Sequence, residues 1–425
     1  MTAEPTAQQP IRVLRLTPHF YWPQCAKTDW PVKFDAIGGM QSQIYRLTRQ
    51  LAEAEGEPVH QTVLTLRIPG APREWQLAEH TTVRGVRVPV LPFRSRIRGM
   101  VDLNLAWALG VIGYLVRERR RPDVLHVHCS GVLIPPLLGW LLCRVLRVPL
   151  VLNVHCSIMV TYHPMNTLDR LLQPFARWVE RRAIRAAART VVLTPRTIPI
   201  FTERTGLPAE RFAVLPDVID ADTFSARATD ESVAEFRASW NLPPAAKVVG
   251  YVGRIAREKG WPIILDIAEQ LRDDDVHWLV CGDGNERDLF EKDVAARGLT
   301  GRVTVTGYLP NEDVPVAMGA MDLLLQASLH EEFGSVMLEA MACGLPIVAT
   351  GTGGVADVLE HGELGWLVEE RTAPVLAKGI RAALADPDWR RDTAERAAKT
   401  VRARYDLEQV SIAMIEVFRT VTAHD

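Results

Sequence analysis

The sequence predicts an α/β protein made of two doubly wound, Rossmann-like domains that face a cleft. The first reason is length, because 425 residues exceed what one hydrophobic core usually holds. The second is an alternation of short β-rich runs with stretches of helical periodicity, which is typical of parallel sheets. The third is that this alternation starts again in the second half. The apolar content of 48% and the net charge of −2 are those of an ordinary globular protein.

The first domain is predicted at residues 11–215, after a flexible N-terminus at 1–10. Its expected strands lie at 11–16, 59–66, 83–90, 124–127, 150–154 and 190–193. Its expected helices lie at 39–53, 103–120, 136–146 and 167–189. Residues 131–152 are apolar enough to suggest a membrane span. Because Pro136 and Arg144 interrupt them, we expect no transmembrane segment.

The second domain is predicted at residues 216–405. Its expected strands lie at 248–251, 277–281, 303–306, 323–326 and 347–349. The helices between them are expected at 260–272, 285–297, 311–320, 335–343 and 373–385. A last helix, within 406–425, is expected to pack back on the first domain. Ligands of doubly wound sheets bind outside the carboxyl ends of the strands, so the site is expected there.

Charge and cysteine usage limit the classes of function. Residues 1–215 contain 28 Lys and Arg against 15 Asp and Glu. Because 26 of these 28 are Arg, a GC-rich genome explains the bias better than a binding surface, and we expect no nucleic-acid partner. No cysteines form a C-x-x-C pair, and the N-terminus lacks a signal-peptide pattern. These features indicate a cytoplasmic protein with free thiols.

The most informative stretch is Q-A-S-L-H-E-E-F-G-S-V-M-L-E-A-M-A-C-G-L-P at residues 326–346. Phe333, Gly334 and Ser335 form a predicted turn within it, and Ser335 is the expected N-cap of the apolar helix that follows. Backbone amides at the start of such a helix are free donors at its positive end. This arrangement suits a diphosphate.

Two carboxylates, Glu331 and Glu339, flank this helix start eight positions apart. Fixed acceptors on both sides of an anion site suit a ligand with phosphates in its middle and hydroxyl groups at both ends. A sugar nucleotide has that layout. For this segment alone, the alternative is an ordinary capped core helix with two solvated glutamates.

Two further turns are candidates for binding phosphate. Arg254 and Lys259 follow the strand at 248–251, at the mouth of a helix, where a charge-assisted hydrogen bond to phosphate contributes about 1.5–3 kcal/mol. Gly38 and Gly39 begin the first helix, and such a pair lets backbone amides approach phosphate closely. They do not form the G-x-G-x-x-G fingerprint of dinucleotide binding. The alternatives are solvated basic side chains and an ordinary loop.

Three histidines lie near predicted strand ends. His155 follows the strand at 150–154, where it is expected to face the cleft, although a structural role is the alternative. His126 and His128 alternate along another strand. No third ligand has suitable spacing, so core or supporting roles are preferred to a metal site. The D-A-D run at 220–222 resembles a metal-binding D-x-D motif, but it lies in the connection between the domains, and we predict no metal.

Together these elements resemble the large family of retaining glycosyltransferases with the two-domain GT-B fold. The resemblance spans about residues 215–370 and is carried by Gly253-Arg254, Lys259-Gly260, Gly282-Asp283-Gly284, Gly307-Tyr308-Leu309-Pro310 and Glu331…Glu339. It implies that Glu331 holds the donor sugar and Glu339 the nucleotide ribose. It also implies that Arg254 and Lys259 hold the diphosphate.

By the same resemblance, the catalytic residues are Glu331, Arg254, Lys259 and His155, with His155 near the donor hydroxymethyl group. The implied donor site contains Gly38, Gly39, Arg254, Lys259, Gly282, Tyr308, Leu309, Glu331, Phe333, Gly334, Ser335 and Glu339. Apart from the UDP-sugar as co-substrate, no cofactor or metal is implied. The family linker usually reads P-N-G, and the run P-D-V at 216–218 departs from it, which leaves the hinge geometry open.

The first domain resembles more closely the enzymes of aminoglycoside antibiotic assembly that glycosylate 2-deoxystreptamine, at 15–20, 29–41, 154–157 and 162–165. This resemblance implies transfer of glucose or N-acetylglucosamine from a UDP-sugar with retained α configuration. The expected acceptor-binding residues are Asp29, Trp30, Asp35 and Tyr162. Carboxylates beside an aromatic face suit a cationic aminocyclitol ring. The alternative is that Trp30 packs the loop and both aspartates cap turns.

Two other functions stay open. One is a membrane-associated glycosyltransferase with a lipid acceptor, which the basic first half and Arg177, Arg181, Arg182 and Arg185 on one helix favour. The other is a nucleotide-sugar-binding scaffold. The presence of Glu331, Arg254 and Lys259 together argues against it. The sequence does not decide between the two donor sugars. It also leaves the oligomeric state open, and a homodimer is compatible with it.

Overall fold

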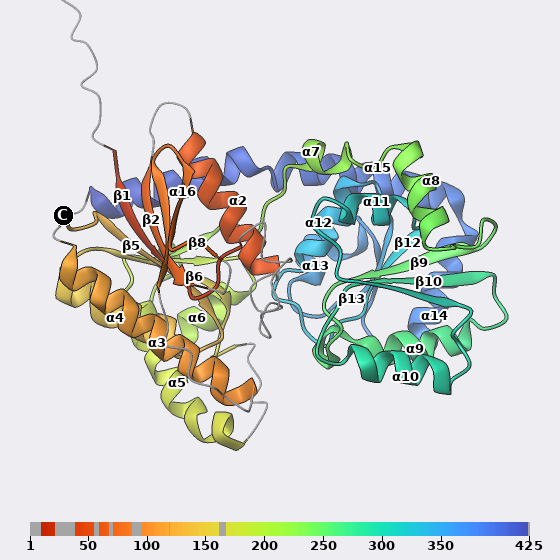
Figure 1. Ribbon diagram of the computed structural model, residues 1–425, viewed down its shortest axis with the longest axis horizontal. Helices are drawn as coiled ribbons and strands as arrows, with labels where there is room; N and C mark the ends of the chain where they lie inside the picture. Colours follow the sequence, from red (N-terminus) through yellow and green to blue (C-terminus); the bar gives the residue numbers. More distant parts are fainter. Residues whose placement is uncertain are drawn as a thin grey trace, which may run out of the picture. The chain divides into compact units, whose positions relative to one another are not determined.

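The computed structural model describes residues 10–21, 39–54, 59–67, 71–86, 96–118, 120–160 and 167–423. The chain divides into two compact units, Asp217–Asp406 and Met1–Pro216 with Leu407–Asp425. Each unit contains one mainly parallel sheet with helices on both faces (Figure 1). Parallel sheets need such cover because their strands are apolar on both sides.

The sheet of the first unit has eight strands in the order β3-β4-β2-β1-β5-β6-β7-β8. Neighbouring strands are parallel except β3 and β4. The strands are β1 (Arg12–Leu16), β2 (His60–Leu66), β3 (Glu74–Ala78), β4 (Thr81–Val86), β5 (Val124–Ser130), β6 (Leu150–Cys156), β7 (Arg189–Val192) and β8 (Phe212–Val214). Strand order changes direction between β1 and β5, which makes this the topological switch point.

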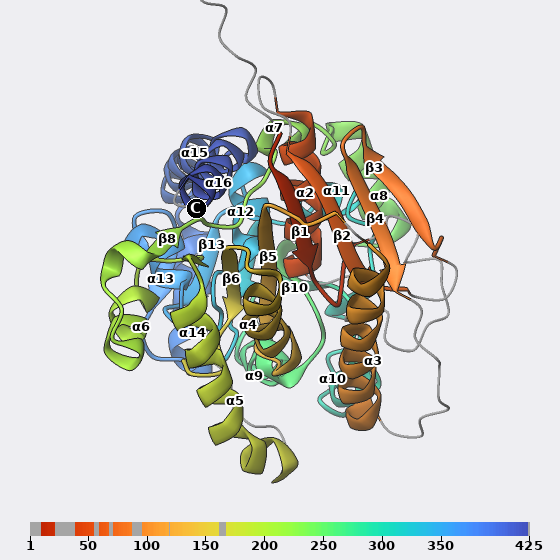
Figure 2. The same cartoon turned by 90° about the vertical axis from the view of Figure 1, so that its left-hand side faces the viewer.

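Two helical layers cover this sheet. One layer holds α3 (Arg96–Arg117), α4 (Ile134–Leu146), α5 (Thr167–Ala186) and α6 (Thr197–Thr205), and Figure 2 shows α3, α4 and α5 side by side. The other holds α2 (Gly39–Glu53) and the C-terminal helix α16 (Leu407–Thr422), which pack on each other. Successive side chains of a strand point to opposite faces. Leu14, Leu125 and Leu152 therefore join the apolar core beneath α3 and α4.

The sheet of the second unit has six parallel strands in the order β11-β10-β9-β12-β13-β14. They are β9 (Lys247–Val252), β10 (Val276–Cys281), β11 (Val303–Gly307), β12 (Leu323–Gln326), β13 (Ile347–Thr350) and β14 (Trp366–Val368). This is the strand order of a Rossmann fold, with its switch point between β9 and β12.

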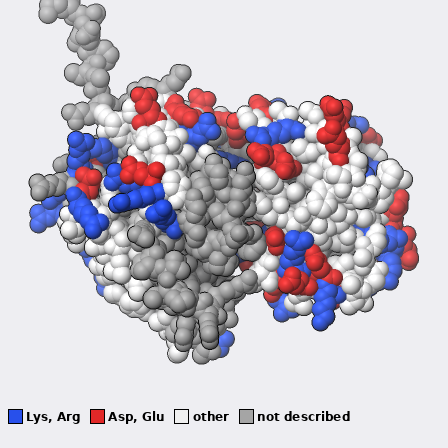
Figure 3. Space-filling model, in the orientation of Figure 1, with Lys and Arg blue, Asp and Glu red and all other residues white. Residues whose placement is uncertain are grey.

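Helices also cover both faces of the second sheet. The apolar core under one face is shared by α9 (Trp261–Gln270), α10 (Arg287–Ala296) and α14 (Ala373–Ala385). The other helices are α7 (Ala221–Ser225), α8 (Asp230–Ser239), α11 (Val314–Gly319), α12 (Ser335–Ala342), α13 (Val355–Val358) and α15 (Pro387–Arg404). Among these, α12 packs against α7, α11 and α15. Charged side chains of both signs are interspersed on the visible face of this unit (Figure 3).

Sequence and structure agree best where a helix has one strongly apolar face. Helices α2 and α14 have the predicted bounds. The sequence does not predict β3, β8 or β14, which are short and lie at or next to sheet edges, where little apolar surface is buried. The first part of the predicted second domain, residues 216–245, contains α7 and α8. No residue of α8 is fully buried, so its apolar periodicity is weak.

Two further predictions, on membrane spans and on cysteines, can be compared with the described residues. Within those ranges, no helix is long and apolar enough to cross a membrane. The described cysteines are free thiols, namely Cys129, Cys143, Cys156, Cys281 and Cys343.

Candidate functional site

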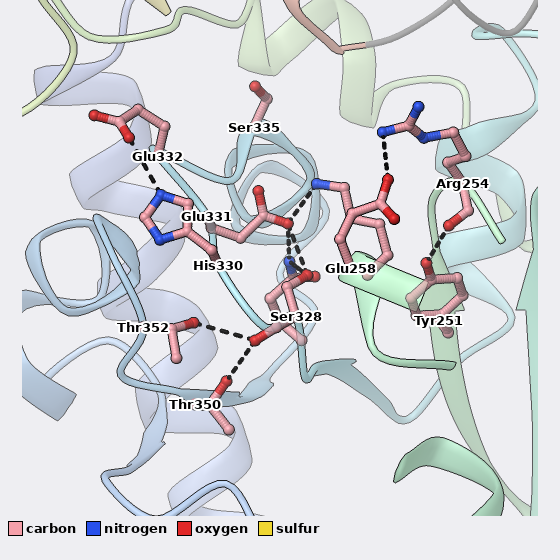
Figure 4. Close-up of polar contacts among 12 residues, drawn as sticks. Tyr251, Arg254, Glu258, Ser328, His330, Glu331, Glu332, Ser335, Thr350 and Thr352 are labelled. Atoms are coloured by element: carbon pink, nitrogen blue, oxygen red, sulfur yellow. Dashed lines mark hydrogen bonds and ion pairs between the residues drawn. The ribbon is translucent and has the colours of Figure 1, made fainter. Parts of the chain in front are cut away.

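The candidate site of the second unit lies at the switch point of its sheet. Arg254 follows β9 and Glu331 follows β12, and these two strands are neighbours. Ligands of doubly wound sheets bind at this position because the loops from the two halves of the sheet diverge there. The strand order therefore brings together the two segments that the sequence singles out (Figure 4).

Glu331 is the centre of this site, and the residue is only 8% exposed. Its Oε1 accepts hydrogen bonds from Lys259 Nζ at 2.7 Å, Gln326 Nε2 at 2.8 Å and Ser328 Oγ at 2.8 Å. No described residue donates to the other oxygen, Oε2. A buried carboxylate needs such partners to offset its lost hydration. The network thus fixes one oxygen and leaves the other for a ligand.

The cationic turn after β9 is held by an ion pair and by a hydrogen bond from the Tyr251 side chain. Lys259 ends a 3₁₀ turn at Arg257–Lys259, directly before α9. Arg254 forms an exposed ion pair with Glu258 at 2.9 Å, and its carbonyl oxygen accepts a hydrogen bond from the Tyr251 hydroxyl at 2.7 Å. Burial raises the pKa of Tyr251, so this phenol stays protonated and donates. Both cations therefore stand beside carboxylates, one exposed and one buried.

The start of α12 corrects one prediction. Ser335 is the first residue of the helix, and Gly334 is the N-cap, with φ of 88°. The Ser335 hydroxyl donates to Asp217 rather than to the end of its own helix. Because the left-handed conformation at Gly334 strains residues with a Cβ, glycine suits this turn best. The departure at Asp217 from the family linker thus supplies an anchor for α12.

Sequence reasoning misses the support beneath Glu331. The carbonyl oxygen of Glu331 accepts from the amide of Gly354 at 2.9 Å. At Gly353 the φ is 64°, and a Cβ there would lie 1.7 Å from that same oxygen. A glycine pair that directly follows a strand, G-T-G-G after β13, is the signal that points to this loop. A glycine pair is also the pattern from which the sequence predicts a phosphate-binding turn at Gly38 and Gly39.

The other proposed donor-site residues of this unit lie at strand ends or on α12. Gly282 follows β10 and approaches Gly253 so closely that a Cβ would lie 1.8 Å from its carbonyl oxygen. Tyr308 and Leu309 follow β11 and are half-buried, as is Glu339 on α12. Phe333 is 3% exposed, and its ring packs against Tyr405, with ring centroids 5.7 Å apart. The side chain of Phe333 is therefore packed in the core and is not open to a ligand.

In the first unit, His155 lies at the end of β6 and is half-buried. Its Nε2 lies 2.9 Å from Nδ1 of His128 and 3.1 Å from the amide nitrogen of Asn153. Burial, followed by the charge of Arg15, lowers the pKa of His155 to about 4. Burial likewise holds the pKa values of His126 and His128 well below their usual range. All three imidazoles are therefore neutral at pH 7.

The described residues contain no group of three or more potential metal ligands among His, Cys, Asp and Glu. The two aspartates of the D-A-D run have structural roles instead. Asp220 caps α7 by accepting from the amide of Thr223, and Asp222 forms an ion pair with Arg402 at 2.7 Å.

Comparison with known proteins agrees with this geometry. Residues 232–400 match the family of glycosyl transferases group 1, and residues 38–217 match the glycosyl transferase 4-like domain. The 2-deoxystreptamine N-acetyl-D-glucosaminyltransferase of Streptomyces fradiae is 38% identical over 410 residues, which are 95% of this chain and 96% of the relative. The 2-deoxystreptamine glucosyltransferase of Streptomyces kanamyceticus is 39% identical over 82% of this chain and 90% of the relative.

The chain belongs to the group 1 glycosyltransferases. Its fold is GT-B: sucrose-phosphate synthase from Thermosynechococcus elongatus matches it with a TM-score of 0.80 at 22% identity, over 98% of this chain and 100% of that one.

Several predicted residues of this glycosyltransferase lie outside the described part of the chain. They are Asp29, Trp30, Asp35, Tyr162 and Gly38. Gly39 is described and begins α2. Conversely, the structure adds Tyr251, Gln326, Ser328 and Gly353 to the candidate site of the glycosyltransferase.

Proposed function

We propose that this glycosyltransferase transfers glucose or N-acetylglucosamine from a UDP-sugar to 2-deoxystreptamine, with retention of the α configuration and without a metal ion. The acceptor is supported by the relatives of 38% and 39% identity over most of the chain, which are 2-deoxystreptamine glycosyltransferases. The observation that carries the donor site is the Lys259–Glu331 pair at the switch point of the second sheet.

The proposed chemistry follows from charge. Transfer leaves negative charge on the departing diphosphate, and cations placed beside it stabilise the transition state more than the ground state. Lys259 and Arg254 supply this charge, and the amides at the start of α12 add donors at the positive end of that helix. These groups take the place that a divalent metal fills in other enzymes.

The two glutamates divide the remaining donor contacts. The Oε2 oxygen of Glu331 accepts from hydroxyl groups of the sugar, while Oε1 stays engaged with Gln326 and Ser328. Glu339, on the next turn of α12, accepts from the ribose hydroxyls. Gly39 with Gly38, and His155, complete the donor contacts. For the acceptor, we propose that Asp29 and Asp35 pair with the amines of 2-deoxystreptamine and that Trp30 and Tyr162 contribute further contacts.

The test is a substrate panel with the purified full-length chain. UDP-glucose, UDP-N-acetylglucosamine and the corresponding GDP and TDP sugars are each mixed with 2-deoxystreptamine or with a lipid acceptor, and products are read by mass spectrometry. The expected product is a mono-glycosylated aminocyclitol from a UDP-sugar, with an α linkage by NMR. Transfer to the lipid alone would reject the proposed acceptor and support the membrane-associated alternative.

A second test addresses the acceptor site. Asp35→Asn, and less strongly Asp29→Asn, should raise the Michaelis constant for 2-deoxystreptamine and leave that for the UDP-sugar unchanged. The lost ion pair is with the acceptor amines only, so acceptor binding in the wild type should also weaken with added salt. Unchanged acceptor kinetics in both variants would place the acceptor elsewhere.

A further inference from the structure

A polar layer lies on the α2 and α16 side of the first sheet, at its switch point. Arg15 on β1 is completely buried, and its Nη2 donates to Gln61 Oε1 at 2.8 Å. Its Nη1 lies 3.3 Å from His128 Nε2 on β5. His128 Nδ1 lies 2.9 Å from Nε2 of His155 on β6. Three strands thus contribute to a chain of contacts that leads from a buried cation to the half-buried His155.

The direction of each hydrogen bond in this chain follows from Arg15. A guanidinium has donors and no acceptor. His128 Nε2 must therefore carry a lone pair, and since His128 is neutral its proton is on Nδ1. That proton points at His155 Nε2, which must then accept. The same logic leaves the proton of neutral His155 on Nδ1.

Two neighbours agree with this direction. The amide nitrogen of Asn153 lies 3.1 Å from His155 Nε2, so a second donor meets the same lone pair. Gln61 is oriented by Nε2, which donates to the carbonyl oxygen of Thr48 at 2.8 Å and lies 3.2 Å from the Thr81 hydroxyl. The oxygen of its amide is thereby turned toward Arg15. Reversing the chain would place the N–H of His128 against a guanidinium that has no acceptor.

We propose that Arg15, acting through His128, is a positioning residue that sets the tautomer of His155 and keeps it a neutral donor through Nδ1–H. A proton added at Nε2 of His155 would face the N–H of His128 and the amide of Asn153. The same contacts therefore also disfavour the charged form of His155. Arg15 touches neither the donor nor the acceptor in this role. It acts by fixing which nitrogen of His155 carries the proton.

This inference rests on the proposed function in one respect, the role of His155 at the donor hydroxymethyl group. A hydroxyl oxygen there accepts from Nδ1–H. The transition state of glycosyl transfer has oxocarbenium character, with positive charge on the sugar ring. A neutral imidazole holds the hydroxymethyl group without placing a second positive charge beside that ring. An imidazolium would disfavour the same state.

The first experiment needs no activity. The full-length chain is labelled with ¹⁵N-histidine, and His155 is assigned by the signals that disappear in His155→Gln. Long-range ¹H–¹⁵N correlation spectra at pH 6.5 and 7.5 distinguish the two neutral tautomers and the cation. We expect a protonated Nδ1 and an unprotonated Nε2 at both pH values. A proton on Nε2, or a charged ring at pH 6.5, overturns the proposal.

The second experiment substitutes Arg15, the first group in this series of contacts. Arg15→Gln replaces a group with donors only by an amide that can donate or accept, so His155 should populate both tautomers. Arg12→Gln is the matched control, since Arg12 begins the same strand but is exposed and paired with Asp123 at 2.7 Å. Its spectrum should equal that of the wild type. If Arg15→Gln retains a pure Nδ1–H tautomer, Arg15 does not set it.

Turnover supplies an independent reading. Arg15→Gln should lower kcat about tenfold, the scale of one misdirected hydrogen bond, with the donor KM changed less than twofold. Arg12→Gln should retain wild-type turnover. An unchanged kcat beside a mixed tautomer would show that the tautomer has no effect on transfer and would overturn the role given to it. Absence of any transfer by the wild type refutes the proposed function instead, and leaves the tautomer result intact.

Discussion

At the scale of single residues, the donor site depends on where charge is placed. Lys259 and Glu331 are far apart in sequence and 2.7 Å apart in the fold, and Glu331 is buried by the loops around it. Buried charge pairs of this kind are costly to break, because the remaining partner is left without compensation. In a catalytic site the same charges are available for a ligand.

The first prediction compares Lys259, in the turn that follows β9, with Lys247, the first residue of that strand. Lys259→Met should lower kcat about 100-fold, the equivalent of roughly 2.7 kcal/mol of transition-state stabilisation. Lys247→Met removes an exposed pair with Asp322 at 3.1 Å and should leave kcat within about twofold, because exposed pairs contribute little.

Wild-type turnover should also survive EDTA. Loss of turnover in EDTA that Mg²⁺ or Mn²⁺ restores would contradict the metal-free mechanism.

The second prediction separates the two glutamates. Glu331→Gln should mainly lower kcat, because the sugar is misplaced, whereas Glu339→Ala should mainly weaken binding of free UDP. Isothermal titration with UDP and steady-state kinetics on the same preparations distinguish the two effects. Tight UDP binding by Glu339→Ala, equal to that of the wild type, would exclude the ribose role.

At the scale of elements, the loops between strands and helices hold the site in place. The third prediction concerns two glycines of similar conformation. Gly353 has φ of 64° and no room for a Cβ, while Gly298 after α10 has φ of 68° and open space around it. Gly298→Ala should cost about 1–2 kcal/mol of unfolding free energy from backbone strain alone. Gly353→Ala should cost more and also lower kcat, because it displaces the Glu331 carbonyl.

Urea unfolding and steady-state turnover of both alanine variants test this prediction. Equal loss of stability in the two, with wild-type turnover in Gly353→Ala, would mean that the Gly353 loop does not support Glu331.

The fourth prediction concerns the histidines of β5 and β6. Their pKa values in the folded state are depressed below 6.5, so between about pH 4 and pH 6.5 the unfolded chain binds protons that the folded chain does not. The free energy of unfolding should therefore fall as the pH is lowered through this window, by up to about 1.4 kcal/mol per pH unit for each histidine. Above pH 7 these groups should contribute no slope.

The measurement is hydrogen exchange of β5 and β6 amides in urea at pH 7.0 and 5.5, with exchange rates corrected for pH. In His128→Gln one titrating group is removed, so the loss of protection on acidification should be smaller than in the wild type. Equal losses in both proteins would count against the depressed pKa of His128.

At the scale of the whole molecule, the chain leaves the first unit at residue 216 and returns to it at 407. The returning helix α16 buries Val410, Met414, Ile415, Val417, Phe418 and Val421. Phe418 packs edge-on against the His126 ring, with centroids 5.4 Å apart. The C-terminus is thereby part of the fold of the first unit.

The fifth prediction follows from this return. Deleting residues 407–425 removes several large buried side chains, each worth about 1.5–3 kcal/mol, and their sum is comparable to the stability of a whole domain. Hydrogen exchange should show lost protection in β1, β5 and α2, while β9 and β12 stay protected. Deleting only residues 423–425 should change the protection of none of these elements. Protected β1 and β5 in the long deletion would contradict this account.

The parts of the fold that sequence predicted well are those with strong local signals. Helix α2 has a clear apolar face, and the strands β9, β10 and β12 are short apolar runs bounded by turn residues. Edge strand β3 and helix α8 bury little apolar surface, so their patterns are weak. At the candidate site, Glu331 and Lys259 stand out by residue type and spacing. Ser335 is also a residue type that favours the N-cap position, but its hydroxyl donates a hydrogen bond to Asp217 in the folded protein.

Periodicity and turn chemistry are local properties, so the sequence predicts the two Rossmann-like units and the turns that contain charged and glycine residues. Which of these residues meet depends on the tertiary structure. Glu331 rests on Gly353 and Gly354, and Arg15 reaches His155 through His128. Such contacts depend on strand order and register, which place side chains from distant segments within hydrogen-bonding distance. No local pattern of residues encodes that distance.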